Sequence, residues 1–162
     1  MTTKPTSPST TPHSPEVRIS VLIHRRLEST FLVAKCTGTL GQFRAPGGYL
    51  EYGETFLAAA ERLTRKETGL EVHARRVAAV DGEVMGGLGR EKHYVTIFVV
   101  CELQDEGDEP ELCQVVELEE CEGWEWRTWD QLRSEQEREI DMPLANLLDQ
   151  NPSGEMFLRR SL

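Results

Sequence analysis

The sequence predicts an α/β protein in which a mixed β-sheet lies between layers of helices, an α/β/α architecture. Most of the predicted elements are strands, and the few helices are interspersed among them. The near-continuous apolar run over residues 93–103 predicts a strand in the centre of a sheet. A glycine-rich turn followed by an amphipathic segment, residues 46–70, predicts one long helix that crosses from one strand to the next.

Length and composition favour one folded domain. The chain has 162 residues, which is enough to build a single core. Residues 1–15 are dominated by Thr, Ser and Pro and cannot bury much apolar area, so we expect a disordered tail there and a single domain over residues 16–162. No apolar run is long enough to span a bilayer, so we expect no membrane association.

The charge of the chain restricts its partners. A formal net charge of −10 argues against binding a nucleic-acid polymer, because that binding needs a basic surface. A small nucleotide in a local pocket remains compatible with this charge. The four cysteines have neither paired nor zinc-site spacing, and no apolar signal segment begins the chain. We therefore expect reduced thiols in a cytoplasmic protein.

The N-terminal half reads as strands on either side of the long helix. Residues 17–24 and 31–36 are rich in β-branched residues and predict a hairpin. Residues 38–46 predict a short strand that delivers the glycine turn to the end of the sheet. After the helix, residues 72–85 predict a further strand, and the glycines of residues 86–89 predict a loop before the central strand.

The C-terminal part predicts one strand and two helices. Residues 122–128 place Trp124 and Trp126 on one face of a strand. A short helix over residues 129–135 should follow, and residues 142–148 predict a terminal amphipathic helix.

The long helix has clear start and stop signals. Thr55 stands where an N-cap belongs, residues 56–67 are good helix formers, and Gly69 is placed to end the helix. Positions 63, 66 and 67 lie three and four residues apart, so their side chains share one helix face.

The same stretch resembles the signature of the Nudix family: Gly, five residues, Glu, seven residues, then Arg-Glu-aliphatic-any-Glu-Glu-any-Gly-aliphatic. The resemblance implies a Nudix fold and Mg²⁺-assisted hydrolysis of a nucleoside di- or triphosphate. It also implies structural roles for Gly47 and Gly69, and an ion pair between Glu54 and Arg62 that ties loop to helix. The matching positions are Gly48, Glu54, Arg62, Glu67, Gly69 and Leu70.

The sequence departs from this signature at Leu63, Thr64 and Lys66. Carboxylates at positions 63, 66 and 67 would share one helix face and could hold a hard divalent cation, but only Glu67 offers a ligand here. We therefore expect Mg²⁺ to bind weakly or not at all, and ordinary metal-dependent hydrolysis to be weak or lost.

Three further stretches, PGGYLEYGET, HYVTI and CEGWEW, resemble the MutT-like nucleotide diphosphatase subgroup of the thiopurine-nucleotide-hydrolysing type. This resemblance implies that Gly48, Tyr49, Thr96 and Trp126 bind the substrate. It also implies a homodimer.

Glu67, Lys66 and His93 are the candidate catalytic residues, and Glu67 is the candidate metal ligand. Lys66 is either a solvated surface residue or a cation in the place of the metal. Leu63 either extends the apolar stripe of the helix or lines a remodelled cavity. His93 is the best-placed histidine for a base.

Three functional classes remain open: a residual Nudix hydrolase, a metal-independent enzyme that performs acid–base chemistry such as isomerisation or cyclisation, and a non-catalytic nucleotide-binding module.

Overall fold

The computed structural model describes residues 14–36, 42–87, 91–111, 121–135 and 139–158. The predicted tail over residues 1–15 lies almost entirely outside these ranges. Gly89 of the predicted loop and residues 37–41 also lie outside them.

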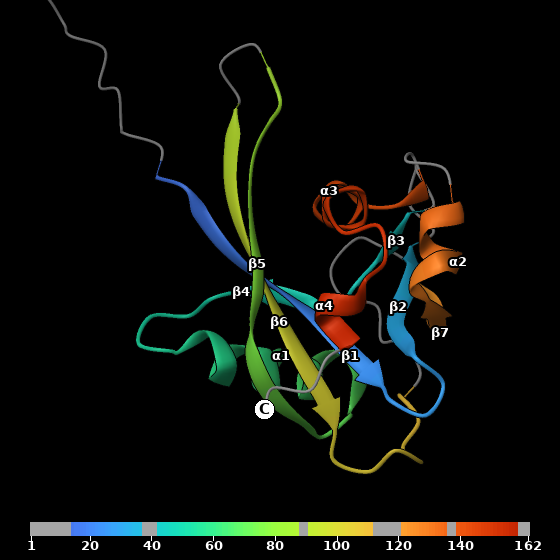
Figure 1. Cartoon of the computed structure of the whole chain (residues 1–162). Helices are drawn as coiled ribbons and strands as arrows, with labels where there is room; N and C mark the ends of the chain where they lie inside the picture. Colours follow the sequence, from blue (N-terminus) through green and yellow to red (C-terminus); the bar gives the residue numbers. More distant parts are fainter. Residues whose placement is uncertain (1–13, 37–41, 88–90, 112–120, 136–138, 159–162) are drawn as a thin grey trace, which may run out of the picture.

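One mixed sheet forms the centre of the molecule (Figure 1). Its strand order is β3-β2-β1-β6-β5, with β4 paired to β1 and β7 paired to β2. β1 and β6 run parallel, and the other pairs are antiparallel. The strands are β1 (Glu16–Arg25), β2 (Thr30–Cys36), β3 (Phe43–Arg44), β4 (Gly47–Tyr49), β5 (Val72–Met85), β6 (Lys92–Leu103) and β7 (Cys121–Thr128).

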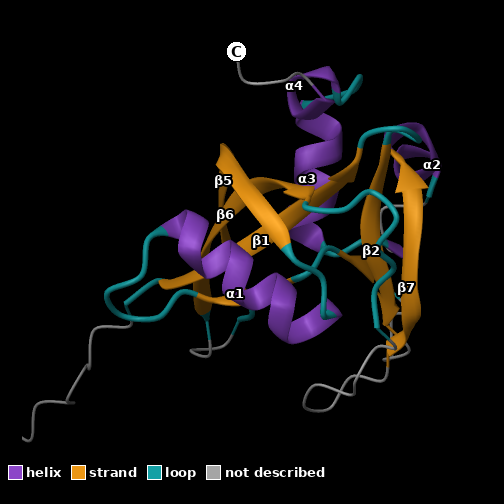
Figure 2. Ribbon diagram, turned by 90° about the horizontal axis from the view of Figure 1, so that it is seen from below, coloured by secondary structure: helices purple, strands orange, loops and turns teal. Residues whose placement is uncertain are grey.

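Helices cover both faces of this sheet, as Figure 2 shows. α1 lies on one face, and α2, α3 and α4 lie on the other. The predicted α/β/α architecture is confirmed. Within the described ranges, no helix has the length and apolar character needed to cross a membrane. The helices are α1 (Phe56–Thr68), α2 (Trp129–Ser134), α3 (Met142–Gln150) and α4 (Glu155–Leu158).

Local signals set the ends of α1 where the sequence places them. The Thr55 hydroxyl accepts a hydrogen bond from the Ala58 amide at 3.1 Å, which satisfies one of the unpaired N–H groups of the first turn. Gly69 adopts a left-handed conformation with φ of 74°, and its N–H bonds to the carbonyl of Arg65.

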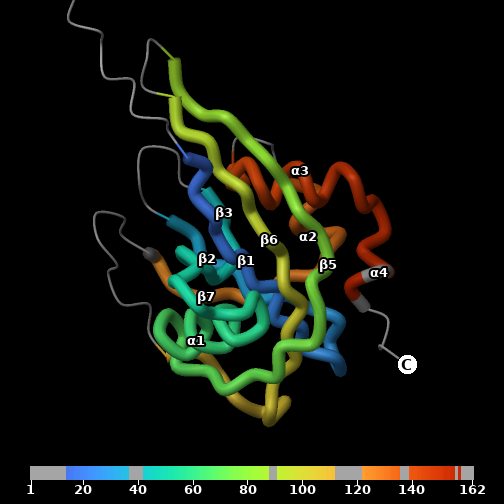
Figure 3. The backbone as a smooth tube through the Cα atoms, turned by 90° about the vertical axis from the view of Figure 1, so that its left-hand side faces the viewer, coloured from blue at the N-terminus to red at the C-terminus, as the bar shows by residue number. Residues whose placement is uncertain are grey.

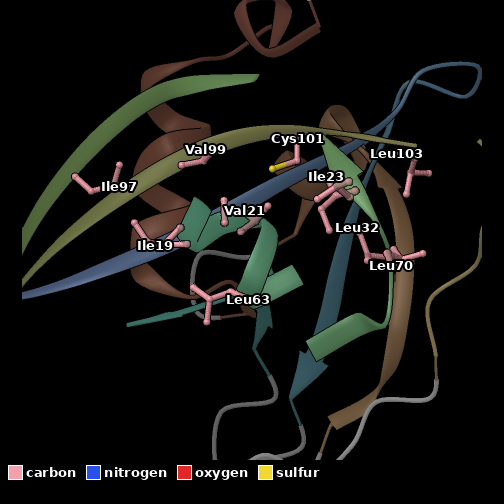
Figure 4. Packing of buried hydrophobic residues seen from close by; sticks show 13 residues of the cluster. Ile19, Val21, Ile23, Leu32, Leu63, Leu70, Ile97, Val99, Cys101 and Leu103 are labelled. Carbon is pink, nitrogen blue, oxygen red and sulfur yellow. The ribbon is translucent and has the colours of Figure 1, made fainter. Parts of the chain in front are cut away.

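Two apolar cores lie on the two faces of the sheet. The first packs α1 against β1 and β6, and it contains Leu63, Ile19 and Val21 (Figure 4). The second packs α2, α3 and α4 against the other face, around Phe98 and Leu144. Each of β1 and β6 contributes residues to both cores, because successive side chains along a strand point to opposite faces of the sheet.

The paired glycines are expected to form a turn, but in the structure they form a strand. Gly47–Tyr49 is β4 and pairs with Arg18, Ile19 and Ser20 of β1. A Cβ atom at Gly47 would lie closer than 3.0 Å to the carbonyl oxygen of Ile19. The glycine therefore allows close approach of two backbones, in addition to any role in turning the chain.

The remaining elements differ from the predictions mainly at their ends. The predicted short strand is only β3, and α3 continues two residues beyond residue 148. α4 is not predicted by the sequence analysis. β6 lies between β1 and β5 as expected of a central strand, and its long pairing with β5 is visible in Figure 3.

Candidate functional site

A cavity of about 690 Å³ opens between the sheet, the end of α1 and the start of α3. Its lining combines cationic, acidic and hydroxyl side chains with the glycine strand. The lining residues are Arg18, Ile19, Ser20, Arg44, Ala45, Gly47, Gly48, Tyr49, Glu67, Lys92, Thr96, Asp141 and Pro143.

The parallel pairing of β1 and β6 brings two of these side chains together. Arg18 and Thr96 are register partners, so they lie beside each other on the same face of the sheet. Lys92 lies on that face too, because it is four residues from Thr96 in the same strand. The hydroxyl of Thr96 is buried and has no hydrogen-bond partner in the described structure.

Glu67 forms an ion pair with an arginine inside this cavity. Arg44 Nη1 lies 3.0 Å from Glu67 Oε2, and both side chains are largely buried. Burial disfavours the Arg44 cation, but Glu67, together with Cys36, outweighs this cost and raises the pKa of Arg44. The Arg44 guanidinium also lies 5.6 Å from the ring centroid of Trp124. The cation beside Glu67 is thus Arg44 from β3.

Arg18 is held between two aromatic rings. Its Cζ lies 3.7 Å from the ring centroid of Tyr94 and 5.2 Å from that of Tyr49. Arg18 Nη2 also donates to the Tyr49 hydroxyl at 3.1 Å. No ion pair to a carboxylate is found for Arg18 among the residues with assigned positions. At longer range its positive charge opposes the rise in the pKa of Glu83 and of Asp141.

The residues of the signature helix do not fit a magnesium site. Leu63 is 4% exposed and packs into the first core, where its Cδ2 would lie 2.7 Å from a Cβ atom at Gly48. Lys66 is exposed and does not line the cavity. Glu67 is paired with Arg44. Across the described ranges, no three His, Cys, Asp or Glu side chains are grouped so that they could hold a metal ion.

The predicted ion pair between loop and helix is present. Arg62 Nη2 donates to Glu54 Oε2 at 2.9 Å, and Arg62 Nε donates to the other carboxylate oxygen. Arg62 also donates to the carbonyl of Tyr49 at 3.1 Å, which links the helix to the cavity wall. The hydrogen bond from Arg62 lowers the pKa of Glu54. The pair therefore positions the end of β4.

The structure brings together only part of the predicted site. Gly48, Tyr49 and Thr96 line the cavity together with Glu67. His93 is exposed and points to the opposite face of the sheet, because side chains alternate along β6.

The cavity lining does not include Trp126. Its ring lies 4.0 Å below the Arg25 guanidinium, and its N–H donates to Glu109 at 3.2 Å. Trp124, two residues earlier, is the tryptophan near Arg44.

Four charged residues of the cavity lining are not predicted from the sequence, namely Arg18, Arg44, Lys92 and Asp141. Arg18 and Arg44 do not belong to a recognisable sequence motif. Asp141 has a weak signal, because an acidic residue two positions before Pro143 is typical of a helix N-cap. Its carboxylate caps α3 by accepting from the Leu144 amide at 3.3 Å.

Comparison with known proteins identifies the domain family and the fold. Residues 14–149 match the model of the NUDIX domain family. The fold is similar to a NUDIX hydrolase from Nitrosomonas europaea, with a TM-score of 0.64, 17% identity and coverage of 86% of this chain and 88% of that one.

Two further structures are similar. A MutT NUDIX hydrolase from Burkholderia pseudomallei has a TM-score of 0.63 and 22% identity, with 85% and 98% of the two chains covered. A UDP-X diphosphatase has a TM-score of 0.61 and 22% identity, with 91% and 68% covered. At these identities the likeness shows a shared fold.

Proposed function

Because this chain belongs to the NUDIX domain family, we propose that its cavity binds a small anionic metabolite, with a nucleotide as the first candidate, and that ordinary metal-dependent hydrolysis is weak or lost. One observation carries the proposal: Glu67, the remaining carboxylate of the signature trio, is ion-paired with Arg44 at 3.0 Å in the cavity. An arginine thus supplies the positive charge that a metal ion would otherwise bring.

The chemistry of the lining supports an anionic ligand. A guanidinium has five N–H donors, and Arg44 Nη1 serves Glu67 and the Ala45 carbonyl. Arg18 and Lys92 add two further cations to the same lining. Arginine matches phosphate and carboxylate groups with paired hydrogen bonds. The cavity can therefore hold an anion although the chain as a whole carries a net charge of −10.

We also propose that this chain is related to the MutT-like subgroup, and to its thiopurine-nucleotide-hydrolysing type. The position of Tyr49 and Thr96 in the cavity lining supports this relation. In the same proposal the signature is degenerate, since Leu63 lies in the apolar core and Lys66 lies on the surface. A bound nucleotide would then meet Arg44 and Arg18 without a metal-activated water.

A second candidate is a metal-independent enzyme that uses acid–base chemistry. The observation that favours it is Asp141, whose carboxyl group lines the cavity. Burial raises the pKa of Asp141 to about 7, so this group can both accept and donate a proton near neutral pH.

Binding in the presence of EDTA tests the proposal. Titration with ADP, GMP and UDP, followed by tryptophan fluorescence, should show binding without divalent metal. Arg44→Ala should weaken it about 10- to 100-fold, the effect of losing a hydrogen bond to a charged group. Arg75→Ala is the matched control, because Arg75 is exposed, pairs with Glu102 and lies outside the cavity lining.

Removing Arg44 also leaves Glu67 unpaired, which could repel an anion. The double variant Arg44→Ala, Glu67→Gln separates the two effects, since it removes both charges. Affinity that stays low in the double variant supports a direct role of Arg44. Rapid Mg²⁺-dependent hydrolysis of nucleoside triphosphates by the unmodified protein, abolished by Glu67→Gln, would contradict the proposal.

A further inference from the structure

We infer that Asp141 is the acid–base group of this cavity and that it takes up a proton when an anion binds beside it. The inference rests on the proposed function, because it requires an anion to bind at Arg44 and Arg18. It adds a residue and a proton transfer that the family signature does not contain.

The position of Asp141 is fixed by two parts of the chain. Its amide donates to the carbonyl of Phe43 at 2.9 Å, next to the isolated bridge between Phe43 and Ile140. Its Oδ1 atom accepts from the Leu144 amide at 3.3 Å. These bonds hold the carboxyl at the junction of β3 and α3, where it lines the cavity with Arg44. The other carboxyl oxygen makes no hydrogen bond within the part of the chain that the structure describes, so it can meet a ligand.

Charges on three strands act on this carboxyl. Burial raises the pKa of Asp141 to about 7, and Glu83 of β5 adds to the rise. The Leu144 amide, Arg44 of β3 and Arg18 of β1 oppose it. Lys92 of β6 lines the same cavity. A pKa of about 7 allows Asp141 to change its protonation state near neutral pH.

Glu83 of β5 is a second buried carboxyl group, without a polar partner among the described residues, although it does not belong to the cavity lining. Its side chain is buried, and neither carboxyl oxygen has a hydrogen bond in the described structure. Burial first, and then Asp81, raises the pKa of Glu83, whereas Arg18 opposes the rise. Glu83 pairs with Tyr94 and so shares its sheet face with Thr96, whose hydroxyl is also unpartnered. Buried polar groups without a protein partner call for a water, an ion or a ligand, and of these two residues Thr96 lines the cavity itself.

An anion in this site changes the protonation of Asp141 in a definite direction. A negative ligand beside the carboxylate disfavours its charged form, so its pKa rises further on binding. Between the two pKa values, each bound anion is accompanied by one proton, which solvent supplies and which forms an O–H bond on the carboxyl. The proton returns to solvent when the anion leaves. While the anion is bound, the neutral carboxyl can donate this proton to it, as a metal-independent acid–base reaction requires.

Inorganic sulfate is a suitable probe, because it stays fully ionised between pH 6 and 9 and any pH dependence then belongs to the protein. We expect the affinity of the unmodified protein for sulfate to fall as pH rises above 7, by up to about tenfold per pH unit. Asp141→Asn should remove this slope. Asparagine is an equally good N-cap, so α3 should persist in the variant.

Calorimetry gives a second readout that does not depend on affinity alone. Sulfate titrations at pH 7.5 in cationic buffers of different ionisation enthalpy report the number of protons taken up. The unmodified protein should take up a measurable fraction of one proton, and Asp141→Asn should take up none. Asp130→Asn is the matched control, because Asp130 is an exposed carboxylate in the first turn of α2.

The outcomes separate the two proposals. If sulfate binds with an Arg44-dependent but pH-independent affinity, anion binding stands and the role of Asp141 is overturned. If the slope persists in Asp141→Asn and disappears in Glu83→Gln, Glu83 is the proton-exchanging group and the assignment to Asp141 is wrong. If sulfate and the nucleotides fail to bind, or if Arg44→Ala has no effect, both proposals fail.

Discussion

At the scale of single residues, the paired glycines show the tightest steric limits in the site. β4 lies so close to β1 that a Cβ atom at Gly47 would overlap the Ile19 carbonyl. At Gly48 the same atom would meet the Leu63 side chain at 2.7 Å. Gly47 thus allows β4 and β1 to lie close together, and Gly48 allows Leu63 of α1 to pack against β4.

Gly47→Ala should therefore destabilise the fold. The added methyl group must push β4 away from β1, a form of overpacking that costs about 1–3 kcal/mol. For a domain of this size we expect the melting temperature to fall by roughly 2–4 °C per kcal/mol in thermal unfolding. Gly82→Ala is the control, since nothing lies within 4 Å of a Cβ atom there. Equal melting of the two variants would mean that β4 does not pair with β1 as described.

At the scale of elements, α1 is tied to the preceding loop by Glu54 and Arg62. The hydrogen bond from Arg62, followed by that from the Glu51 amide, lowers the pKa of Glu54 in the folded protein. A carboxylate with a lowered folded pKa stabilises the fold fully above its unfolded pKa, here near 4.5. This contribution is lost as pH falls through the lower folded value.

We expect Arg62→Ala to lower the melting temperature at pH 7 more than Arg65→Ala does. The Arg65–Glu71 pair is more exposed on both sides, and exposed ion pairs contribute little. The difference between the unmodified protein and Arg62→Ala should shrink below pH 4.5, when Glu54 becomes protonated. Melting curves across pH 3–7 check both statements, and a difference independent of pH would argue against the pair.

Leu63→Glu with Lys66→Glu would place two further carboxylates beside Glu67 on one face of α1. A carboxylate at position 63 enters the first core, so the double variant should be less stable without metal and should regain stability as Mg²⁺ is added. Hydrolysis of nucleoside triphosphates should rise by at least about tenfold, or ~1.4 kcal/mol in barrier. Lys66→Glu alone is the control, because Lys66 is exposed.

A rebuilt variant that folds and binds Mg²⁺ but hydrolyses no nucleotide would show that the cavity has diverged from nucleotides. A non-nucleotide anion would then become the better ligand.

At the scale of the whole molecule, a strongly acidic chain surrounds a cavity with three cationic side chains. The overall charge of −10 attracts divalent cations only weakly. In the cavity Arg18 and Lys92 oppose them, Arg44 is paired with Glu67, and Asp141 is the remaining acidic residue of the lining. The local charges act on a ligand in the cavity more strongly than the distant surface charges do, because the Coulomb energy falls with distance.

Calorimetric titration with Mg²⁺ or Mn²⁺ should accordingly show no site tighter than about millimolar, or roughly −4 kcal/mol. Glu67→Ala should leave this weak binding unchanged, since Glu67 is already neutralised by Arg44. A micromolar site would mean that carboxylates outside the signature helix assemble a metal centre.

The sequence by itself determines the features that depend on neighbours within a few residues. Thr55 and Gly69 set the ends of α1 through caps that act within one helical turn. Glu54 and Arg62 meet across eight residues, and runs rich in apolar and β-branched residues mark β1, β2 and β6. The α/β/α layering follows from the same periodicities.

Only the tertiary structure decides which side chains share the cavity. Arg18, Arg44 and Asp141 lie on β1, β3 and the start of α3, and no spacing in the sequence joins them. They meet because β1 pairs in parallel with β6 and because Phe43 bridges to Ile140. The same packing sends His93 to the other face and places Trp124 near Arg44. Strand register and helix docking are long-range contacts, and the order of residues along the chain carries no local record of them.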